Sequence, residues 1–360
     1  MNIETLLLAS FGLAFLFGWL ANQSHFCTLG AISDYVYMED STRLRQWGIA
    51  ATIGIIGTQI LAIQHWVPIE QSFYLQPKLY WLAHLVGGSC FGVGMVLASG
   101  CSNKTLLRIG QGNLKALVVL IVMGLTAWMT LKGLFSIPRV NWLQAPVLFF
   151  EKKASLFSLF PFVSDITQFW LTIGFCSGLL FFFSWQKTTF ISWRVFLTAL
   201  GIGSLIPLGW LITGHFAYLE NPDTLEMGFL ITNSHTPESF SFVAPSAYLL
   251  ELLTLWTDQS LHLSFGIISL IGVILGALFY SLFTKQFALE SFADSTDLMK
   301  HLGGAVLMGF GGVTGLGCTI GQGMSGLSTL AMGSFLTLGS ILISSFLMLK
   351  YQYYRIMQEN

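Results

Sequence analysis

The chain has 360 residues, of which 54% are hydrophobic and 9% are charged, and its formal net charge is −1. Soluble globular proteins carry about 25% charged residues, so this composition and the mean hydropathy of +0.71 exclude a water-soluble globule. The low net charge gives no extended basic or acidic surface, which argues against nucleic-acid binding. We therefore expect an all-α integral membrane protein with a single transmembrane domain over residues 1–360.

A helix needs about 20 mostly apolar residues to cross a hydrocarbon core of about 30 Å. The N-terminal stretch has no Lys or Arg before Arg43 and lacks the basic region and cleavage site of a secretory signal, so we expect it to stay as the first helix. Two shorter segments, 26–38 and 242–256, are expected to be re-entrant or interfacial. About nine stretches can cross, near residues 4–21, 47–65, 81–99, 114–134, 167–185, 194–213, 261–284, 301–317 and 326–349.

The distribution of charges predicts the orientation of the chain. Residues 214–260 contain six acidic residues and no Lys or Arg, so the positive-inside rule places this segment outside. The N-terminus is then external and the C-terminus cytoplasmic. Four basic residues between 132 and 153 fall on the external side and count against this scheme. The basic residues that support it include Arg43, Arg45, Lys350 and Arg355.

One segment of the chain occurs twice, at residues 84–101 (HLVGGSCFGVGMVLASGC) and 301–318 (HLGGAVLMGFGGVTGLGC). Eight of the eighteen aligned positions are identical, and each copy is followed by IGQG, at 109–112 and 320–323. An odd number of predicted crossings separates the copies, so they must run in opposite directions. Such inverted repeats are a transporter plan in which broken helices meet near the bilayer midplane and build the substrate site. We expect approximate halves of 1–160 and 165–360.

The five cysteines form no CxxC pair and predict neither a disulfide framework nor a metal site. A free cysteine is ordinarily a small buried apolar residue, but Cys101 and Cys318 end the two copies at equivalent positions, which favours a function. Cys27 lies in a polar interruption after the first helix and is interpreted in the same way. Cys90 and Cys176 lie inside apolar runs and are interpreted as packing residues. No cofactor is expected.

Residues beside these cysteines have the chemistry of an anion site. Backbone amides at a glycine-rich helix end suit an anion, whereas close helix packing is the alternative explanation for mid-helix glycines. Asn103 and Lys104 could attract a dianion, although Lys104 and Arg108 could instead be cytoplasmic anchors. His84 and His301 begin their helices about 25 Å from the cysteines, at 1.5 Å per residue, so we expect them to have a capping or hydrogen-bonding role. The further candidates are Gly100, Gly317, Gly321, Gln322 and Gly323.

Four segments resemble the signature segments of the YeeE/YedE membrane proteins. They are SHFCTLGAISD around Cys27, ASGCSNKTLLRIGQGNLKALVVL around Cys101, SFSFVAPSAY at 239–248 and MGFGGVTGLGCTIGQGMSGLSTLAMGSF around Cys318. The resemblance implies an inner-membrane, hourglass-like inverted-repeat fold that takes up thiosulfate or a related sulfur species. It also implies that the three cysteines mark successive positions on the substrate path, and that a soluble TusA-like sulfur carrier is a candidate partner. Some members of this family are associated with selenium metabolism.

The chemistry of thiosulfate is compatible with this resemblance. Thiosulfate is a small dianion with a soft terminal sulfur, and a neutral thiol can donate a weak hydrogen bond to it. A thiolate would repel a dianion, so we expect non-covalent relay along neutral thiols. Two alternatives stay open: a membrane thiol enzyme that handles sulfane sulfur, and a transporter of a selenium compound. The sequence contains none of the common hydrolase, nucleotide-binding or kinase motifs, and we do not expect an enzyme.

Overall fold

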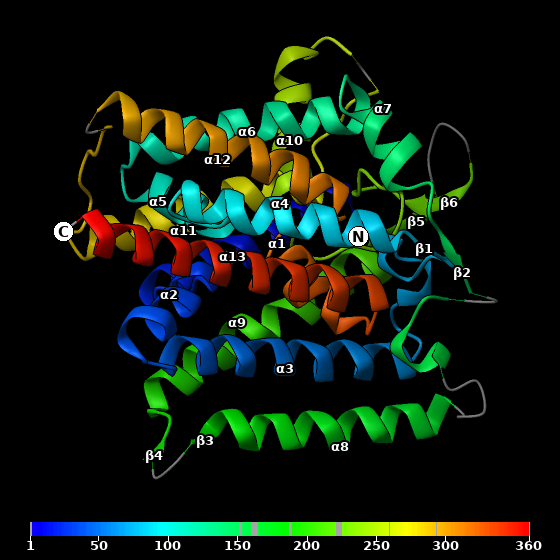
Figure 1. Ribbon diagram of the computed structural model, residues 1–360. Coiled ribbons are helices and arrows are strands. Elements are labelled where there is room, and N and C mark those ends of the chain that lie inside the picture. The colour runs from blue at the N-terminus through cyan, green and yellow to red at the C-terminus, as the bar shows by residue number, and fades with distance from the viewer. Residues whose placement is uncertain are drawn as a thin grey trace.

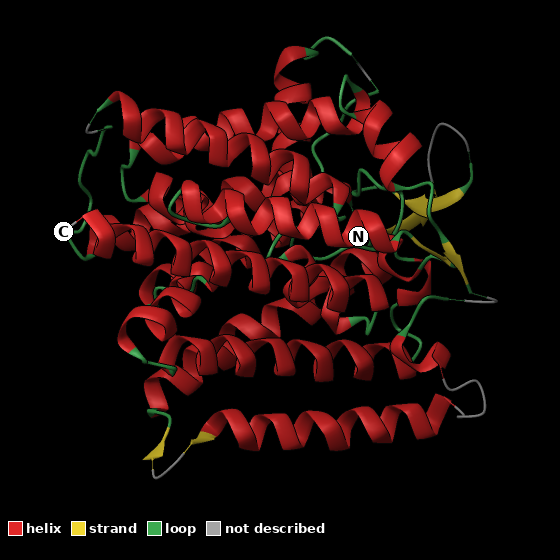
Figure 2. Cartoon of the chain, in the orientation of Figure 1, coloured by secondary structure: helices red, strands yellow, loops and turns green. Residues whose placement is uncertain are grey.

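The computed structural model describes residues 2–150, 153–159, 165–186, 189–220, 225–258, 260–292 and 294–359. Its helices lie side by side in one bundle, with most connections gathered at the two ends (Figure 1). The described strands form three short antiparallel pairs, which lie at the ends of the bundle (Figure 2). The predicted all-α membrane fold is therefore confirmed.

Among the described residues, eight helical segments are long and apolar enough to cross a membrane, by length and composition. Two of these segments are interrupted, and the interruptions contain Cys27 and Cys101. The segments are α1 (Ile3–Gln23) with α2 (Thr28–Met38), α3 (Thr42–Ile63), α4 (Trp81–Leu97) with α5 (Ser102–Gly110), α6 (Leu114–Lys132), α8 (Asp165–Ser184), α9 (Trp193–Leu211), α11 (Phe265–Phe283) and α13 (Met332–Glu359).

The predicted span at 301–317 is helix α12 (Ser295–Thr314), which is not among these eight. Its polar first turns, which include Asp297 and Lys300, and its glycines make it less apolar than the others. Helix α12 nevertheless packs along α4 and α6 inside the bundle (Figure 1). It is therefore a further helix of the membrane domain, as the apolar stretch at 301–317 predicts, although the whole helix is not among the eight candidate spans.

The segment expected to be re-entrant near 242–256 enters the bundle. Its helix, α10 (Val243–Thr254), has 12 residues and is too short to be a candidate span. The residues before it pass through the core, where Phe240 and Phe242 are fully buried. The Phe240 ring stacks on Phe17 of α1 with 5.2 Å between the ring centroids. This segment is therefore part of the packed core of the bundle.

The remaining elements are short. They are α7 (Ser136–Pro138), the 3-10 turns Ile69–Gln71, Phe73–Leu75 and Leu156–Leu159, the π-helical turns Arg139–Leu143, Ile212–Phe216 and Gly321–Gly326, and the strands β1 (Lys78–Leu79), β2 (Leu148–Phe149), β3 (Trp185–Gln186), β4 (Thr189–Phe190), β5 (Tyr218–Glu220) and β6 (Met227–Phe229).

The two copies of the repeated segment cross each other through glycines. A Cβ atom added at Gly87 of α4 would lie 2.9 Å from the carbonyl oxygen of Gly311 in α12, and one added at Gly94 would lie 2.7 Å from that of Gly304. Gly87 and Gly304 are equivalent positions of the two copies, and so are Gly94 and Gly311. The contact between Gly87 and Gly311 is therefore repeated by the equivalent contact between Gly304 and Gly94. The contact is therefore two-fold symmetric and the copies run in opposite directions, as predicted. The boundaries of the two halves stay a prediction.

The basic residues that count against the predicted orientation are mostly partnered. Lys132 forms an ion pair of 2.6 Å with Glu251, and Lys153 pairs with Glu70. The Arg139 guanidinium donates to the carbonyl of Thr130. Lys152 lies outside the described residues. The positive-inside rule counts Lys and Arg and gives little weight to acidic partners, so these residues still count against the predicted orientation.

Candidate substrate pathway

Three helices end in the same way, each four residues before a cysteine. The residue after each helix C-cap has a left-handed backbone, with φ between 51° and 59°. The next amide donates to the carbonyl five residues earlier, at 2.7 to 2.9 Å, which is the six-to-one bond of a Schellman motif. The helices are α1, α4 and α12, the left-handed residues are His25, Ser99 and Leu316, and the donating amides belong to Phe26, Gly100 and Gly317.

A new helical turn begins directly after each of these chain reversals. Cys27 is the N-cap of α2 and Cys101 is the N-cap of α5, while the Cys318 carbonyl accepts from the amide of Gln322 at 2.8 Å. The amide of Gly30 donates to the Cys27 sulfur at 3.4 Å, and that of Gly321 donates to the Cys318 sulfur at 3.3 Å. We call residues 25–30, 99–104 and 316–321 the cysteine turns. Each turn places a thiol at the partially positive start of a helical turn.

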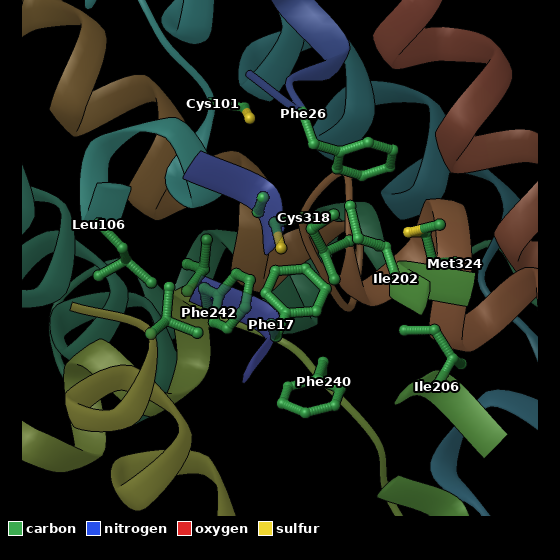
Figure 3. Packing of buried hydrophobic residues seen from close by; sticks show 14 of the residues in the cluster. Phe17, Phe26, Cys101, Leu106, Ile202, Ile206, Phe240, Phe242, Cys318 and Met324 are labelled. Atoms are coloured by element: carbon green, nitrogen blue, oxygen red, sulfur yellow. The ribbon is translucent and has the colours of Figure 1, made fainter. Parts of the chain in front are cut away.

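The three cysteine turns meet inside the protein. The sulfurs of Cys27 and Cys101 lie 4.0 Å apart, and either thiol can donate to the other. Thr319, which follows Cys318, interacts with the Cys101 thiol. Cys101 and Cys318 are fully buried, and Cys27 is 7% exposed. Figure 3 shows Cys101 and Cys318 in one buried cluster with Phe17, Phe26 and Phe242.

Two predicted site residues tie the cysteine turns in place. The side-chain amide of Asn103 donates to the Phe26 carbonyl at 3.1 Å and so joins the Cys101 turn to the Cys27 turn. That of Gln322 donates to the Gly315 carbonyl at 2.7 Å. The remaining oxygens, Oδ1 of Asn103 and Oε1 of Gln322, are buried and have no hydrogen-bond partner in the described part of the chain. Both side chains therefore hold the turns in position, and each still has one side-chain oxygen that can accept a hydrogen bond.

The predicted glycines have different local roles. Gly100 and Gly317 carry the closing amides of their Schellman motifs, and Gly321 supplies the amide that donates to Cys318. A Cβ added at Gly323 would lie 2.9 Å from the Trp47 ring, which shows close packing rather than an open amide site.

A basic cavity of about 350 Å³ lies beside Cys27. The ammonium of Lys104 lies near Cys27, Cys101, Arg43 and Arg108, and Arg108 also lines the cavity, so the two predicted cations of α5 both belong to this site. Arg43 also pairs with Asp34 at 3.2 Å. The lining includes His25, Cys27, Arg43, Lys104, Arg108 and Gln352.

A second cavity, of about 200 Å³, lies beside Gly317 and is called the Gly317 cavity. Glu238 lines it, and burial raises the pKa of this carboxyl from 4.5 to about 7, although the Ser234 hydroxyl donates to it at 3.1 Å and opposes the shift. Ser241 and Leu316 also line this cavity. Cavities therefore adjoin the cysteine turns at Cys27 and at Gly317, with the Cys101 thiol between these two turns.

Three polar residues of this region were not identified from the sequence. The hydroxyl oxygens of Thr28, Ser102 and Thr319 are buried and have no hydrogen-bond partner among the residues described. Each follows a cysteine directly, so the signal in the sequence is a Ser or Thr after Cys27, Cys101 and Cys318.

Other candidates lie away from this region or have structural contacts. The His84 ring bonds to the Thr337 hydroxyl at 2.7 Å, and His301 bonds to the Asp297 carbonyl at 2.8 Å, which agrees with their predicted hydrogen-bonding role. Cys176 is buried on α8. Within the described ranges, no group of three His, Cys, Asp or Glu side chains could hold a metal ion.

The fold and these turns define a multi-pass membrane protein with an inverted repeat and a buried polar interior between two cavities. A family model described as "Sulphur transport" matches residues 23–347. The chain therefore belongs to this family, which confirms the YeeE/YedE resemblance. The description is that of a transporter family and not of an enzyme family.

Two curated relatives are similar to the chain over most of its length. The thiosulfate transporter TsuA of Spirochaeta thermophila is 23% identical over 332 residues, which cover 89% of this chain and 92% of the relative. The thiosulfate transporter TsuA of Escherichia coli is 23% identical over 331 residues, which cover 86% of this chain and 84% of the relative.

Proposed function

We propose that this protein takes up thiosulfate, or a closely related small sulfur oxyanion, across the bacterial inner membrane by non-covalent relay along thiols. The observation that carries this proposal is the meeting of the three cysteine turns, in which the Cys27 and Cys101 sulfurs lie 4.0 Å apart and Thr319 of the Cys318 turn lies near the Cys101 thiol. Membership of a sulphur transport family and two relatives named as thiosulfate transporters support the substrate class.

The basic cavity supports an anionic substrate. A cavity lined by cations and bounded by protein concentrates anions, and Lys104 interacts with both Cys27 and Cys101. An anion bound at either of these thiols would therefore lie near the same cation, the Lys104 ammonium. Arg43 and Arg108 extend the positive charge along the same cavity.

The cysteine turns support relay by neutral thiols. An anion that leaves water must regain hydrogen bonds, because an unpaired buried charge costs several kcal/mol or more. The amides that donate to the sulfurs of Cys27 and Cys318 occupy sulfur lone pairs, which leaves each S–H group available to donate. Because the sulfurs of Cys27 and Cys101 lie 4.0 Å apart, the soft end of the substrate can contact one of these thiols before it leaves the other.

Covalent sulfur transfer is the rival mechanism. It requires a thiolate nucleophile, and a thiolate beside a dianion is disfavoured by repulsion. The mechanism we propose therefore forms no persulfide. A selenium analogue of the same charge and shape would meet the same thiols and amides, so a selenium compound stays an alternative substrate.

For the orientation, we propose an external N-terminus and a cytoplasmic C-terminus. The segment 214–260, which contains six acidic residues and no Lys or Arg, supports this through the positive-inside rule, whereas Lys132 and Lys153 on the same side count against it. Gln352 of the C-terminal helix α13 lines the basic cavity, which is then cytoplasmic. A TusA-like carrier is proposed as the cytoplasmic partner, and copurification from membranes given thiosulfate tests this.

Uptake of radiolabelled thiosulfate into proteoliposomes tests the function. We expect saturable uptake by the wild type, little inhibition by sulfate, and loss of uptake in Cys101→Ala at an unchanged protein content. Cys176→Ala, on the peripheral helix α8, is the matched control and should keep uptake. Absence of uptake by the wild type would overturn the proposal, and a labelled persulfide trapped on Cys101 would favour the enzyme instead.

A further inference from the structure

The hydroxyl group that follows each of the three cysteines is buried in the same local setting. Thr28 is 3% exposed, and Ser102 and Thr319 are fully buried. Their oxygens have no hydrogen-bond partner in the part of the chain that the structure describes. A buried hydroxyl without a partner costs free energy. Three such groups at equivalent positions therefore indicate a common reason.

The backbone explains why these hydroxyls lie near the thiols. Each cysteine turn has a left-handed residue, one further residue, the cysteine at the start of a helical turn, and then the hydroxyl residue. The hydroxyl residue thus occupies the first position of the new turn, where its own amide is not used by the helix. In each cysteine turn, the thiol and the hydroxyl therefore belong to adjacent residues at the same reversal of the chain.

The hydroxyl of one turn also lies beside the thiol of another. The Thr319 side chain interacts with the Cys101 thiol, although their geometry falls short of a full hydrogen bond. A group of atoms that contacts Cys101 is therefore within reach of Thr319. The Thr319 hydroxyl therefore belongs to the shared interior of the cysteine turns.

This arrangement matches both ends of a sulfur-terminated oxyanion. Thiols suit the soft terminal sulfur, but they are weak donors for its hard oxygens. A hydroxyl donates a strong, short hydrogen bond to a charged oxygen. Resting on the proposed function, we infer that Thr28, Ser102 and Thr319 donate to the substrate oxygens while the adjacent cysteines hold the sulfur. A substrate must then have both a soft terminal sulfur and charged oxygens. Hydrosulfide has no oxygens and sulfate has no soft sulfur, so neither should be transported.

Substitutions that remove only the hydroxyl test this inference. Thr319→Val and Thr28→Val keep the shape of the side chain, and Ser102→Ala removes a single oxygen. We expect each to raise the KM for labelled thiosulfate about tenfold in proteoliposomes, as for one lost hydrogen bond to a charged group. Thr319→Ser should restore the KM. The control is Thr130→Val, because the Thr130 hydroxyl is fully buried but donates to the Thr126 carbonyl within α6.

The outcomes separate this inference from the proposed function. If the wild type transports thiosulfate and Cys101→Ala does not, but all three hydroxyl variants keep the wild-type KM, the hydroxyls have no role and only the inference fails. If Thr319→Ser is as impaired as Thr319→Val, the position acts through packing and the inference is also wrong. If the wild type takes up no thiosulfate, the proposed function itself fails. Binding of thiosulfate to the purified variants, measured by calorimetry, should weaken by the same factor as the KM.

Discussion

The sulfurs of Cys27 and Cys101 lie 4.0 Å apart, although 74 positions separate the two residues in the chain. Both are free thiols, at the N-caps of α2 and α5. This pair joins the first interrupted segment of the bundle to the second. The contact between these two sulfurs also gives the most direct way to test whether the Cys27 and Cys101 turns meet in the membrane.

Mild oxidation should link Cys27 to Cys101. A two-electron oxidant converts the two thiols to a disulfide with loss of two protons, and a shift of about 2 Å brings sulfurs at this distance to bonding length. Of the five cysteines, we expect maleimide to label three after oxidation and denaturation. Thiosulfate uptake should stop and return on reduction. Cys101→Ser is the control and should keep its four thiols, whereas five labelled thiols in the oxidised wild type would contradict the geometry.

The crossing of α4 and α12 should tolerate no side chain at its contact glycines. A Cβ added at Gly304 would lie 2.6 Å from the carbonyl oxygen of Gly94, while one added at Gly303 meets nothing within 4 Å. We expect Gly304→Ala to lower the thermal unfolding midpoint by several degrees and to reduce uptake. Gly303→Ala, one residue away, should leave the midpoint unchanged or raise it slightly, because alanine stabilises a helix by about 0.5 to 1 kcal/mol relative to glycine. Equal midpoints for the two variants would be inconsistent with the crossing.

Removal of the Lys104 charge should weaken the capture of the anion. Lys104 interacts with the thiols of Cys27 and Cys101 and with two arginines of the basic cavity. We expect Lys104→Gln to raise the KM for thiosulfate about tenfold and to make uptake less sensitive to ionic strength, because the electrostatic attraction is reduced. Lys285→Gln removes a charge that does not line the basic cavity and should behave as the wild type. The same KM in both variants would remove Lys104 from the site.

Glu238 should make the stability of the protein depend on pH. Burial raises the pKa of this carboxyl to about 7, from 4.5, so the folded protein binds more protons than the unfolded chain between these values. Its stabilising contribution is complete below pH 4.5 and is lost as the pH rises to about 7. The unfolding midpoint of the wild type in detergent should therefore fall, relative to Glu238→Gln, between pH 4.5 and about pH 7, and the difference should be constant above that range. Parallel curves for the two proteins would show that Glu238 is not responsible.

Sequence reasoning predicted the membrane class and the opposed repeat because both depend on local patterns. Long apolar stretches define spans, and the glycines shared by residues 84–101 and 301–318 mark the helices that cross. The prediction missed how α12 differs from the other spans, since its position depends on packing against α4 and α6 and not on its own hydropathy.

The candidate site could be predicted only in part. The choice of Cys27, Cys101 and Cys318 followed from repetition and from a polar interruption, but the 4.0 Å approach of two sulfurs depends on the packing of helices far apart in the chain. The buried hydroxyls were missed for another reason. A Ser or Thr after a cysteine is common. Thr28 and Ser102 are distinguished by that position together with a buried hydroxyl that has no hydrogen-bond partner among the described residues.

The glycine contacts between α4 and α12 have a consequence for how such a protein could be divided. Gly87 and Gly94 face Gly311 and Gly304 in a reciprocal pattern, so either copy alone would present a bare backbone groove to lipid. In a half-length chain, this groove would be filled only if the chain paired with a second chain in the opposite orientation. Two separate half-length polypeptides could therefore assemble the same crossing, provided that one of them inserts upside down.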